Sequence, residues 1–419
     1  MIILEGCHMI KKELLEKLAK VAVKIGANVQ KNQLVGIMGP TGSYELVREI
    51  TKQAYEAGAK KVIVVWRDEY IKRYGYEYQS LENLKEVPTW SVDQIQYIVD
   101  QGGCIINVNS PTSDFLKDVD KNKIQAVSKA SAEVMHFFSE YIMSSKAQWT
   151  IICAPNKIWA KKVFPNLNED DAVEALWDAI LKASRVNDNT DSLKEWNKHI
   201  QEIVNRNKIL NDYKFDRLIL KNKLGTNIEL KLVEEHNWVG GRSQTTNNVY
   251  FNPNIPTEEN FTMIHRDGVN GKVYATKPMS FQGKTVNEFW LEFKDGVVID
   301  YDAKQNKEVL ESIINTDEGS KHLGEIALIN FDSPVSNLDI VFYNTMFDEN
   351  SSCHMSLGRA TPLSIKDGHK MELNELKAKG YNHSAVQADF MFGSPDLSII
   401  GITKTDEEIK IFSNGNFTI

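Results

Sequence analysis

The sequence predicts an α/β N-terminal domain, with a mostly parallel sheet and helices on both faces, and an α+β C-terminal domain rich in antiparallel strands. In the first half, continuous apolar runs alternate with amphipathic helical segments, which is the pattern of parallel strands joined by crossover helices. From residue 215 onward, apolar and polar residues alternate as they do in antiparallel strands. A chain of 419 residues is longer than a single hydrophobic core usually accommodates, so we expect two domains, at 1–208 and 209–419.

The first half is expected to begin with a helix over residues 9–26, where apolar residues recur at helical spacing, after an extension at residues 1–8. Four buried strands follow, and the helical segment between the first two makes a βαβ unit, which implies parallel strands. We expect the strands at 34–38, 61–66, 104–108 and 149–153, and further helices at 127–143, from 168 onward and at 188–206.

The second half is expected to contain short antiparallel strands and few helices. Asp295-Gly296 has the composition of a tight hairpin turn, so it is predicted to join two of the strands. A helix-like stretch at 307–315 leads into a segment rich in acids and histidine. The strands are expected at 216–220, 227–232, near 272–276, at 289–293 and at 297–301.

Composition and charge argue against several classes of function. A net charge of −8 and a pI near 5.7 argue against nucleic acid or an anionic membrane as the main partner. No apolar run approaches the length needed to span a bilayer, and the N-terminus lacks the pattern of a signal peptide. The four cysteines are far apart and show no zinc-ribbon spacing, so we expect reduced thiols and a cytoplasmic location.

Two short motifs are weak grounds for other functions. Gly39-Pro40-Thr41-Gly42-Ser43 lies between a strand and a helix, where phosphates often bind, but it matches neither the P-loop nor the dinucleotide pattern. A helix-starting turn is the better interpretation. His265-Arg266-Asp267 is similar to a kinase catalytic motif, but Lys272 stands where that motif has asparagine.

Acids and histidine in separate segments of the second half predict a hydrolytic metal site. Each has an ordinary alternative. Glu258 and Glu259 could be a solvated pair at a helix start, Glu325 could be a charge at a sheet edge, and His354, beside Cys353, could be a satisfied core histidine.

Asp389 is harder to explain without a bound ion. It stands in an apolar run, 382–391, that is predicted to be a strand with His383, Gln387 and Asp389 on one face. A buried carboxylate without a partner costs several kcal/mol, roughly, unless a cation or hydrogen bonds compensate it.

These segments resemble, in the same order, those of the family of dinuclear metallo-aminopeptidases that includes aminopeptidase T and aminopeptidase S. The resemblance covers nearly the whole chain, and the ordered string of motifs is far more specific than any one of them. The matching segments are Asn254–Glu259, Phe261–Thr262, Leu323–Leu328, Phe347–Asn350, Cys353–His354, Leu357–Gly358, Asn382 with Ser384, and Asp389–Met391.

The resemblance implies a cytoplasmic homodimer that removes N-terminal residues from small peptides by means of a water held by two divalent metal ions, Zn, Co or Mn. It places the metal ligands at Glu259, Glu325, His354 and Asp389. The residue that takes the proton from the water is not identified. Glu258 and Glu349 are both expected as possible partners of the α-ammonium group of the substrate.

Two positions depart from the family pattern. Gln387 stands where the family has a second metal-binding histidine, and Thr361 stands where it has a tyrosine. An amide oxygen suits zinc poorly, and a threonine is too short to donate where a phenol would. His383 lies too far along the expected strand to replace Gln387 directly. The sequence therefore leaves two hypotheses: an aminopeptidase whose activity is impaired, or an inactive homologue that binds peptides or has a structural role.

Overall fold

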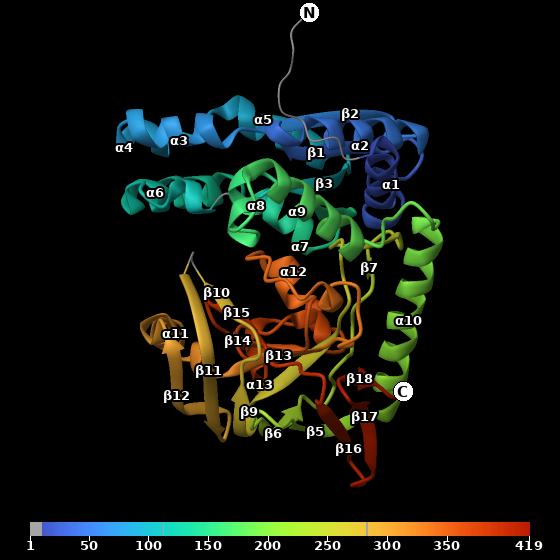
Figure 1. The fold of residues 1–419 in the computed structure, drawn as a ribbon, viewed down its shortest axis with the longest axis vertical. Coiled ribbons are helices and arrows are strands. Elements are labelled where there is room, and N and C mark those ends of the chain that lie inside the picture. The colour runs from blue at the N-terminus through green and yellow to red at the C-terminus, as the bar shows by residue number, and fades with distance from the viewer. Residues whose placement is uncertain (1–10, 112, 282–283) are drawn as a thin grey trace, which may run out of the picture. The chain divides into compact units, whose positions relative to one another are not determined.

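The computed structural model describes residues 11–111, 113–281 and 284–419 (Figure 1). The expected extension at 1–8 and the first two residues of the expected first helix lie outside the described residues. The chain forms two compact units, one made of residues up to Lys198 together with Arg242–Ile255, the other of His199–Gly241 and Pro256–Ile419. The expected domain boundary near 208 stays a prediction. In the part of the chain that is described, no helix is long and apolar enough to cross a membrane.

The first unit is built on a parallel sheet of four strands in the order β2-β1-β3-β4. The parallel sheet confirms the fold predicted for the first half, and all four strands lie where the apolar runs placed them. They are β1 (Leu34–Pro40), β2 (Lys61–Arg67), β3 (Cys104–Asn109) and β4 (Trp149–Cys153).

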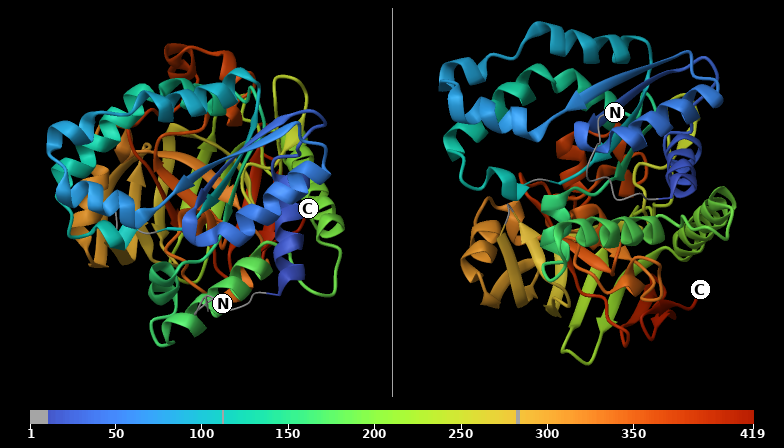
Figure 2. Two further views of the ribbon diagram at one scale, coloured as in Figure 1. Left: turned by 90° about the horizontal axis from the view of Figure 1, so that it is seen from above. Right: turned by 45° about the horizontal axis from the view of Figure 1, so that its top comes forward.

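Helices pack on both faces of this sheet, as predicted (Figure 2). A Cβ at Gly39 of β1 would lie 2.6 Å from Val47 of α2 (Tyr44–Glu56), and a Cβ at Gly36 would lie 2.9 Å from Ile98 of α5 (Thr89–Asp100). Because neighbouring residues of a strand face opposite sides, these glycines let one helix approach each face closely. α1 (Lys12–Val21) packs against α2, and α7 (His136–Met143) packs against α5.

One helix of the first unit differs from its prediction. The helix expected at 127–143 is two helices, α6 (Lys121–Val134) and α7, separated at Met135. The apolar spacing continued across the break, so periodicity alone did not reveal it. The remaining helices are α3 (Glu69–Tyr78), α4 (Leu81–Lys85), α8 (Lys157–Val163), α9 (Glu169–Ala183) and α10 (Ser192–Tyr213), and β7 (Ser243–Gln244) pairs with β8 (Tyr250–Phe251).

The second unit contains an antiparallel sheet of twelve strands around one large apolar core. This confirms the predicted antiparallel C-terminal fold. The main path runs in the order β15-β14-β13-β9-β6-β5-β16-β17-β18, with β10, β11 and β12 branching from it. The strands are β5 (Phe215–Lys221), β6 (Asn227–Leu232), β9 (Asn260–Tyr274), β10 (Met279–Phe281), β11 (Lys284–Lys294), β12 (Val297–Gln305), β13 (Leu323–Leu328), β14 (His354–Gly358), β15 (Gln387–Met391), β16 (Ser398–Thr403), β17 (Glu408–Ser413) and β18 (Asn416–Phe417).

The predicted hairpin turn is confirmed, because Asp295 and Gly296 both have positive φ and join β11 to β12. The strand expected near 272–276 is the end of the long strand β9. The strand expected at 382–391 was predicted too long: only Gln387–Met391 forms β15. Among the described residues this unit also contains α11 (Lys307–Ile314), α12 (Thr345–Glu349) and α13 (Leu373–Ala378), together with the part of α10 from His199 onward.

Candidate metal centre

Three of the four predicted ligands share one face of the sheet where β13, β14 and β15 lie side by side. Glu325 of β13 lies opposite Ser356 of β14, and Ser356 lies opposite Asp389 of β15. Residues directly opposite each other in a sheet project from the same face. His354 stands two residues from Ser356 on β14, so it projects from this face as well.

The fourth, Glu259, comes immediately before β9, the neighbour of β13. Its backbone is fixed by the segment beside it, since Val239 and Phe261 exchange two hydrogen bonds of 2.9 and 3.0 Å. A Cβ at Gly240, where φ is +137°, would lie 2.1 Å from the carbonyl oxygen of Glu259, so glycine permits this approach. The Oε2 atom of Glu259 lies 3.6 Å from Nε2 of His354.

The backbone of α12 orients the His354 ring. Its Nδ1 lies 2.9 Å from the carbonyl oxygen of Glu349, an acceptor only, so Nδ1 carries the proton and donates this hydrogen bond. In the neutral ring, Nε2 then has its lone pair free on the side of Glu259. Metal-binding histidines are commonly oriented in this way, with the other ring nitrogen donating to a carbonyl.

The carboxylates are close enough to influence one another's protonation. Burial, followed by the nearby carboxylates of Glu259 and Asp389, raises the pKa of Glu325 to about 8. Burial also raises the pKa of Glu259; the His354 ring opposes this rise and Asp389 adds to it. Burial and the same carboxylates hold the pKa of Glu349 well above its ordinary value. A fifth group, Glu349, therefore belongs to the same cluster of charge.

Two hydroxyl groups hold the ligand carboxylates in place. Ser356 donates a short hydrogen bond to Oδ1 of Asp389. Thr361 donates one of 2.8 Å to Oε2 of Glu325. Each bond fixes one carboxylate oxygen and leaves the other available. Ser356 was not identified from the sequence, although its place two residues after His354 on a predicted metal-site strand would have pointed to it.

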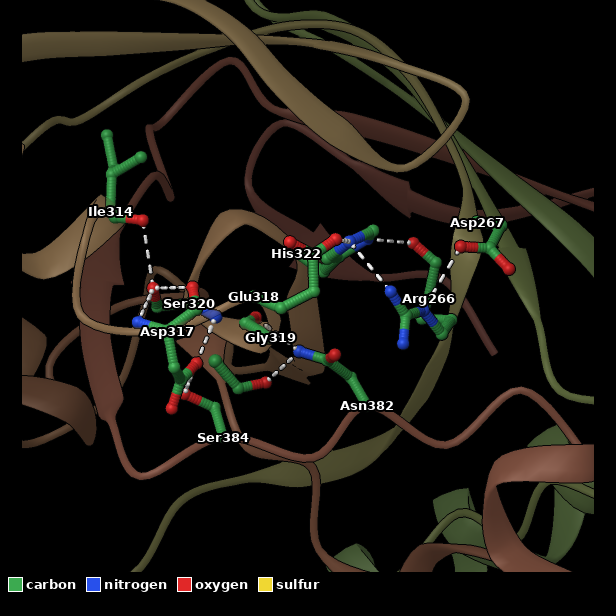
Figure 3. Close-up of polar contacts among 11 residues, drawn as sticks. Arg266, Asp267, Ile314, Asp317, Glu318, Gly319, Ser320, His322, Asn382 and Ser384 are labelled. Carbon is green, nitrogen blue, oxygen red and sulfur yellow. Dashed lines mark hydrogen bonds and ion pairs between the residues drawn. The ribbon is translucent and has the colours of Figure 1, made fainter. Parts of the chain in front are cut away.

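The segments that lead into β13 and β15 are joined by Asp317 (Figure 3). Its Oδ1 accepts hydrogen bonds of 2.8 Å from the amide of Ser320 and from the hydroxyl of Ser384, and its Oδ2 accepts one of 2.7 Å from the amide of Ala385. Asn382 adds hydrogen bonds from Nδ2 to the carbonyl oxygens of Gly319 and Gly358. The strands carrying Glu325 and Asp389 are thereby fixed at their starts.

The rejected kinase-like motif has a packing role in β9. The Nδ1 atom of buried His322, the residue before β13, donates to the carbonyl oxygen of Arg266 at 2.9 Å. Nη2 of Arg266 donates back to Nε2 of His322 at 3.0 Å, and Nε of Arg266 donates to Asp267 (Figure 3). These contacts join β9 to the start of β13.

The two acids expected near the substrate ammonium have different surroundings. The carboxylate of Glu258 is buried and lies 3.5 Å from Nε2 of His199, and its amide donates to Oδ1 of Asn350 at 2.7 Å. Glu349 ends α12 and lies within the electrostatic reach of Glu259, Glu325 and Asp389. Of the two, Glu349 belongs to the cluster of predicted ligands.

Gln387 and His383 do not complete the cluster. Gln387 is the first residue of β15 and is exposed, and among the described contacts its side chain makes no hydrogen bond. The prediction that His383 shares a strand face with Asp389 is wrong, because His383 is exposed and lies before the strand begins. A tightly hydrogen-bonded loop takes the place of the predicted strand start.

The side chains present fit a divalent cation in their chemistry. Among the described residues, no three His, Cys, Asp or Glu side chains already surround a common point as ligands would. The cluster nevertheless consists of carboxylates and one imidazole, which are the ligands of hydrolytic metal sites. Its carboxylates raise one another's pKa, and the charge of a divalent cation would offset that repulsion.

Comparison with known proteins agrees with these observations. The model of the thermophilic metalloprotease (M29) family matches residues 11–417. Aminopeptidase 2 from Geobacillus stearothermophilus is 39% identical over 403 residues, which cover 96% of this chain and 97% of that protein. Aminopeptidase AmpS from Bacillus subtilis is 39% identical over 399 residues, which cover 95% and 97%.

A solved structure has the same fold over the whole chain. Wild-type AmpT from Thermus thermophilus matches with a TM-score of 0.90 at 30% identity, covering 98% of this chain and 100% of that one. The comparisons confirm the resemblance found in the sequence. Because the family model and its relatives match almost from end to end, this chain belongs to the thermophilic metalloprotease (M29) family.

Proposed function

We propose that this protein, a metallo-aminopeptidase by family, removes N-terminal residues from small peptides with a free N-terminus. We propose that Glu259, Glu325, His354 and Asp389 hold two divalent metal ions, Zn, Co or Mn. The observation that carries the proposal is the convergence of these four side chains from separate segments on one buried cluster. Divalent ions held by these residues would supply a water with a lowered pKa and Lewis-acid polarisation of the scissile carbonyl.

The protein's own residues position the ligands and the substrate. The carbonyl oxygen of Glu349 accepts a hydrogen bond from Nδ1 of His354, so that in the neutral ring the lone pair of Nε2 is available to bind an ion. Hydrogen bonds from the hydroxyls of Ser356 and Thr361 restrict the orientations of the Asp389 and Glu325 carboxylates. Ligands held by second contacts lose less freedom when they bind an ion.

Glu349 is the acid that we propose to contact the substrate. Its carboxylate belongs to the cluster, whereas that of Glu258 lies beside His199. A carboxylate with a raised pKa at the cluster can accept a proton from water or pair with the α-ammonium group. Glu258 instead supports the segment that carries Glu259.

We also propose a cytoplasmic homodimer. Both properties rest on the family resemblance, and the sequence supports the location through its widely spaced cysteines. Cys104 and Cys353 are buried as free thiols, which is compatible with a reducing compartment.

The second candidate is an inactive homologue that binds peptides without cleaving them. Two observations favour it: Gln387 is exposed, and the Thr361 hydroxyl is engaged with Glu325, so neither acts where the family pattern has histidine and tyrosine. Both candidates use the same fold and differ in whether turnover occurs.

Hydrolysis of aminoacyl p-nitroanilides separates these candidates. Protein treated with EDTA is supplied with Zn²⁺, Co²⁺ or Mn²⁺ and offered substrates with a free or an N-acetylated α-amino group. We expect release of p-nitroaniline with the free amine only, and only with metal. Absence of turnover with every metal, together with saturable binding of a free-amine peptide, would instead establish the inactive homologue.

A further inference from the structure

The first unit contains a cavity of about 430 Å³ at the carboxyl ends of its parallel strands. Pro40 is the last residue of β1, and Arg67 is the last residue of β2. Ser110 comes after the end of β3, and Asn156 comes after the end of β4. All four residues line the cavity. In the strand order β2-β1-β3-β4, the chain passes from β1 to β2 on one side of β1 and then crosses to β3 on the other side. Ligands of open α/β sheets bind at such a switch point, outside the carboxyl ends of the strands.

Aromatic side chains form much of the cavity wall. Tyr44 of α2, Tyr70 of α3, Phe115 and Trp177 of α9 all line it. The rings of Tyr70 and Phe115 meet edge to face, with centroids 4.7 Å apart and planes at 69°. The volume is within the usual range for small-molecule sites, and walls of this kind favour a flat, largely apolar ligand body.

Arg67 is the cation of this wall that forms no ion pair with a described acid, although the nearby Glu69 carboxylate favours its charged form. Its Nη2 donates to Oδ1 of Asn107, and no described residue places a carboxylate within ion-pair distance of it. Burial lowers the pKa of its guanidinium and the Glu69 carboxylate opposes this shift, while the residue as a whole stays exposed to solvent. The remaining donors of the planar group are suited to bind a carboxylate or phosphate in two places.

The other charged groups of the wall already have partners or lie at its exposed rim. Lys157 lies 3.1 Å from Glu169 and 3.4 Å from Asp170. Asp68 caps α3 by accepting from two amides and accepts a hydrogen bond of 2.6 Å from Thr41. Oε2 of Glu69 lies 3.9 Å from Nζ of Lys72. Among the acids that line the cavity this leaves Glu45, and Glu45 is exposed to solvent.

We propose that this cavity binds a small organic anion, with a flat aromatic body against the Tyr44, Tyr70, Phe115 and Trp177 side chains and its carboxylate or phosphate on Arg67. The start of α2 lies at the cavity, and the positive end of this helix adds to the attraction for an anion, whereas the first amides of α3 are already bonded to Asp68. The site is independent of the proposed peptidase function, because every residue of it belongs to the first unit.

Calorimetric titration of the full-length protein tests the ligand class. The probes are indole-3-acetate and phenyl phosphate, which separate a carboxylate from a phosphate, and their neutral counterparts indole-3-acetamide and phenol. We expect one-to-one binding of at least one anion, with its neutral counterpart about 10-fold weaker or more. Equal binding of anion and neutral compound, or no saturable binding of either anion up to about 10 mM, would overturn the proposal.

Variants test the position of the site. Arg67→Met removes the charge and keeps the apolar stem, so the affinity for the anion should fall about 10-fold or more. Lys157→Met, a change of the paired cation in the same wall, should alter it by less than about 3-fold. If Arg67→Met unfolds, Phe115→Ala provides the second variant and should weaken binding of the aromatic anion similarly. Unchanged affinity in a folded Arg67→Met or Phe115→Ala protein would contradict the assignment.

Discussion

The hydroxyl of Thr361 donates a hydrogen bond of 2.8 Å to Oε2 of Glu325, a predicted metal ligand. Thr361 comes directly before the 3-10 turn Pro362–Ser364 and is separate from the strand that carries Glu325. The residue that stands in place of a tyrosine in the family pattern therefore has a contact of its own. It orients the carboxylate of a predicted ligand.

Thr361→Val should weaken metal binding. The substitution keeps the shape of the side chain and removes the hydrogen bond to Glu325, and loss of such a supporting contact typically costs about 10-fold or more in metal affinity. Calorimetric titration of EDTA-treated protein with Zn²⁺ measures the change. Thr316→Val, which alters an exposed threonine bonded to Ser312, is the matched control and should bind as the unmodified protein does.

The double variant Gln387→His/Thr361→Tyr should be a better peptidase. Histidine adds an imidazole beside Asp389 on β15, and tyrosine adds a phenol donor for developing negative charge. Because Thr361→Tyr also removes the hydrogen bond to Glu325, the activities are compared at saturating metal. We expect kcat/KM for an aminoacyl p-nitroanilide to rise about 10-fold or more, since a donor to an oxyanion is commonly worth at least that much. A double variant that binds metal but gains no activity would show that these two positions do not limit the reaction.

Asp317→Ala should destabilise the second unit. The substitution removes three hydrogen bonds, two of which join the segments before β13 and β15, and at about 1 kcal/mol for each we expect a loss of about 2–3 kcal/mol. Urea unfolding measures the loss. Ser384→Ala removes one of the three together with the hydrogen bond from the Val386 amide, so it should cost about 1–2 kcal/mol. A larger loss in Ser384→Ala than in Asp317→Ala would argue against Asp317 as the junction.

The pH dependence of the free energy of unfolding should reveal the raised pKa of the buried Asp348 carboxyl. Burial raises the pKa of its carboxyl to about 6, although the amides of Phe342 and Asn344 and the nearby Lys277 favour the ionised form. Because the folded-state pKa lies above the unfolded one, the folded state holds the proton more tightly. Its stabilising contribution is complete below pH of about 4 and is lost as the pH rises through about 6.

The comparison with Asp348→Asn isolates this group. Asparagine does not titrate, so the free energy of unfolding of the natural protein minus that of the variant should decrease between pH of about 4 and 7, by up to about 3 kcal/mol. Unfolding in urea at several pH values measures the difference. A difference that stays constant or increases with pH would mean that the folded-state pKa is not raised.

Much of the fold could be predicted because local patterns determine it. The four parallel strands are continuous apolar runs, and the Asp295-Gly296 turn is specified by two residues that accept positive φ. The break at Met135 and the late start of β15 could not be predicted. The first interrupts a helix without disturbing its apolar spacing, and the second depends on Asp317 and Asn382, which bond across the fold.

The candidate site was predicted only in part. An acid in an apolar run, such as Asp389, is a local signal, so it could be recognised. Asp317 gave no such signal, and Ser356 could be noticed only from its place two residues after His354, because small polar residues are common and their contacts arise from strand pairing and loop closure. Glu349 was recognised as a candidate from the sequence. Distinguishing it from Glu258 required the structural surroundings of both carboxylates.

The most direct test of the metal centre is the number of divalent ions bound by EDTA-treated protein after titration with Zn²⁺, Co²⁺ or Mn²⁺. We predict two ions for each chain and a loss of binding in Glu325→Gln and Asp389→Asn, with Glu318→Gln, an exposed acid before the same strand, unchanged. Fewer than one ion for each chain with all three metals, or full binding in both site variants, would contradict the account.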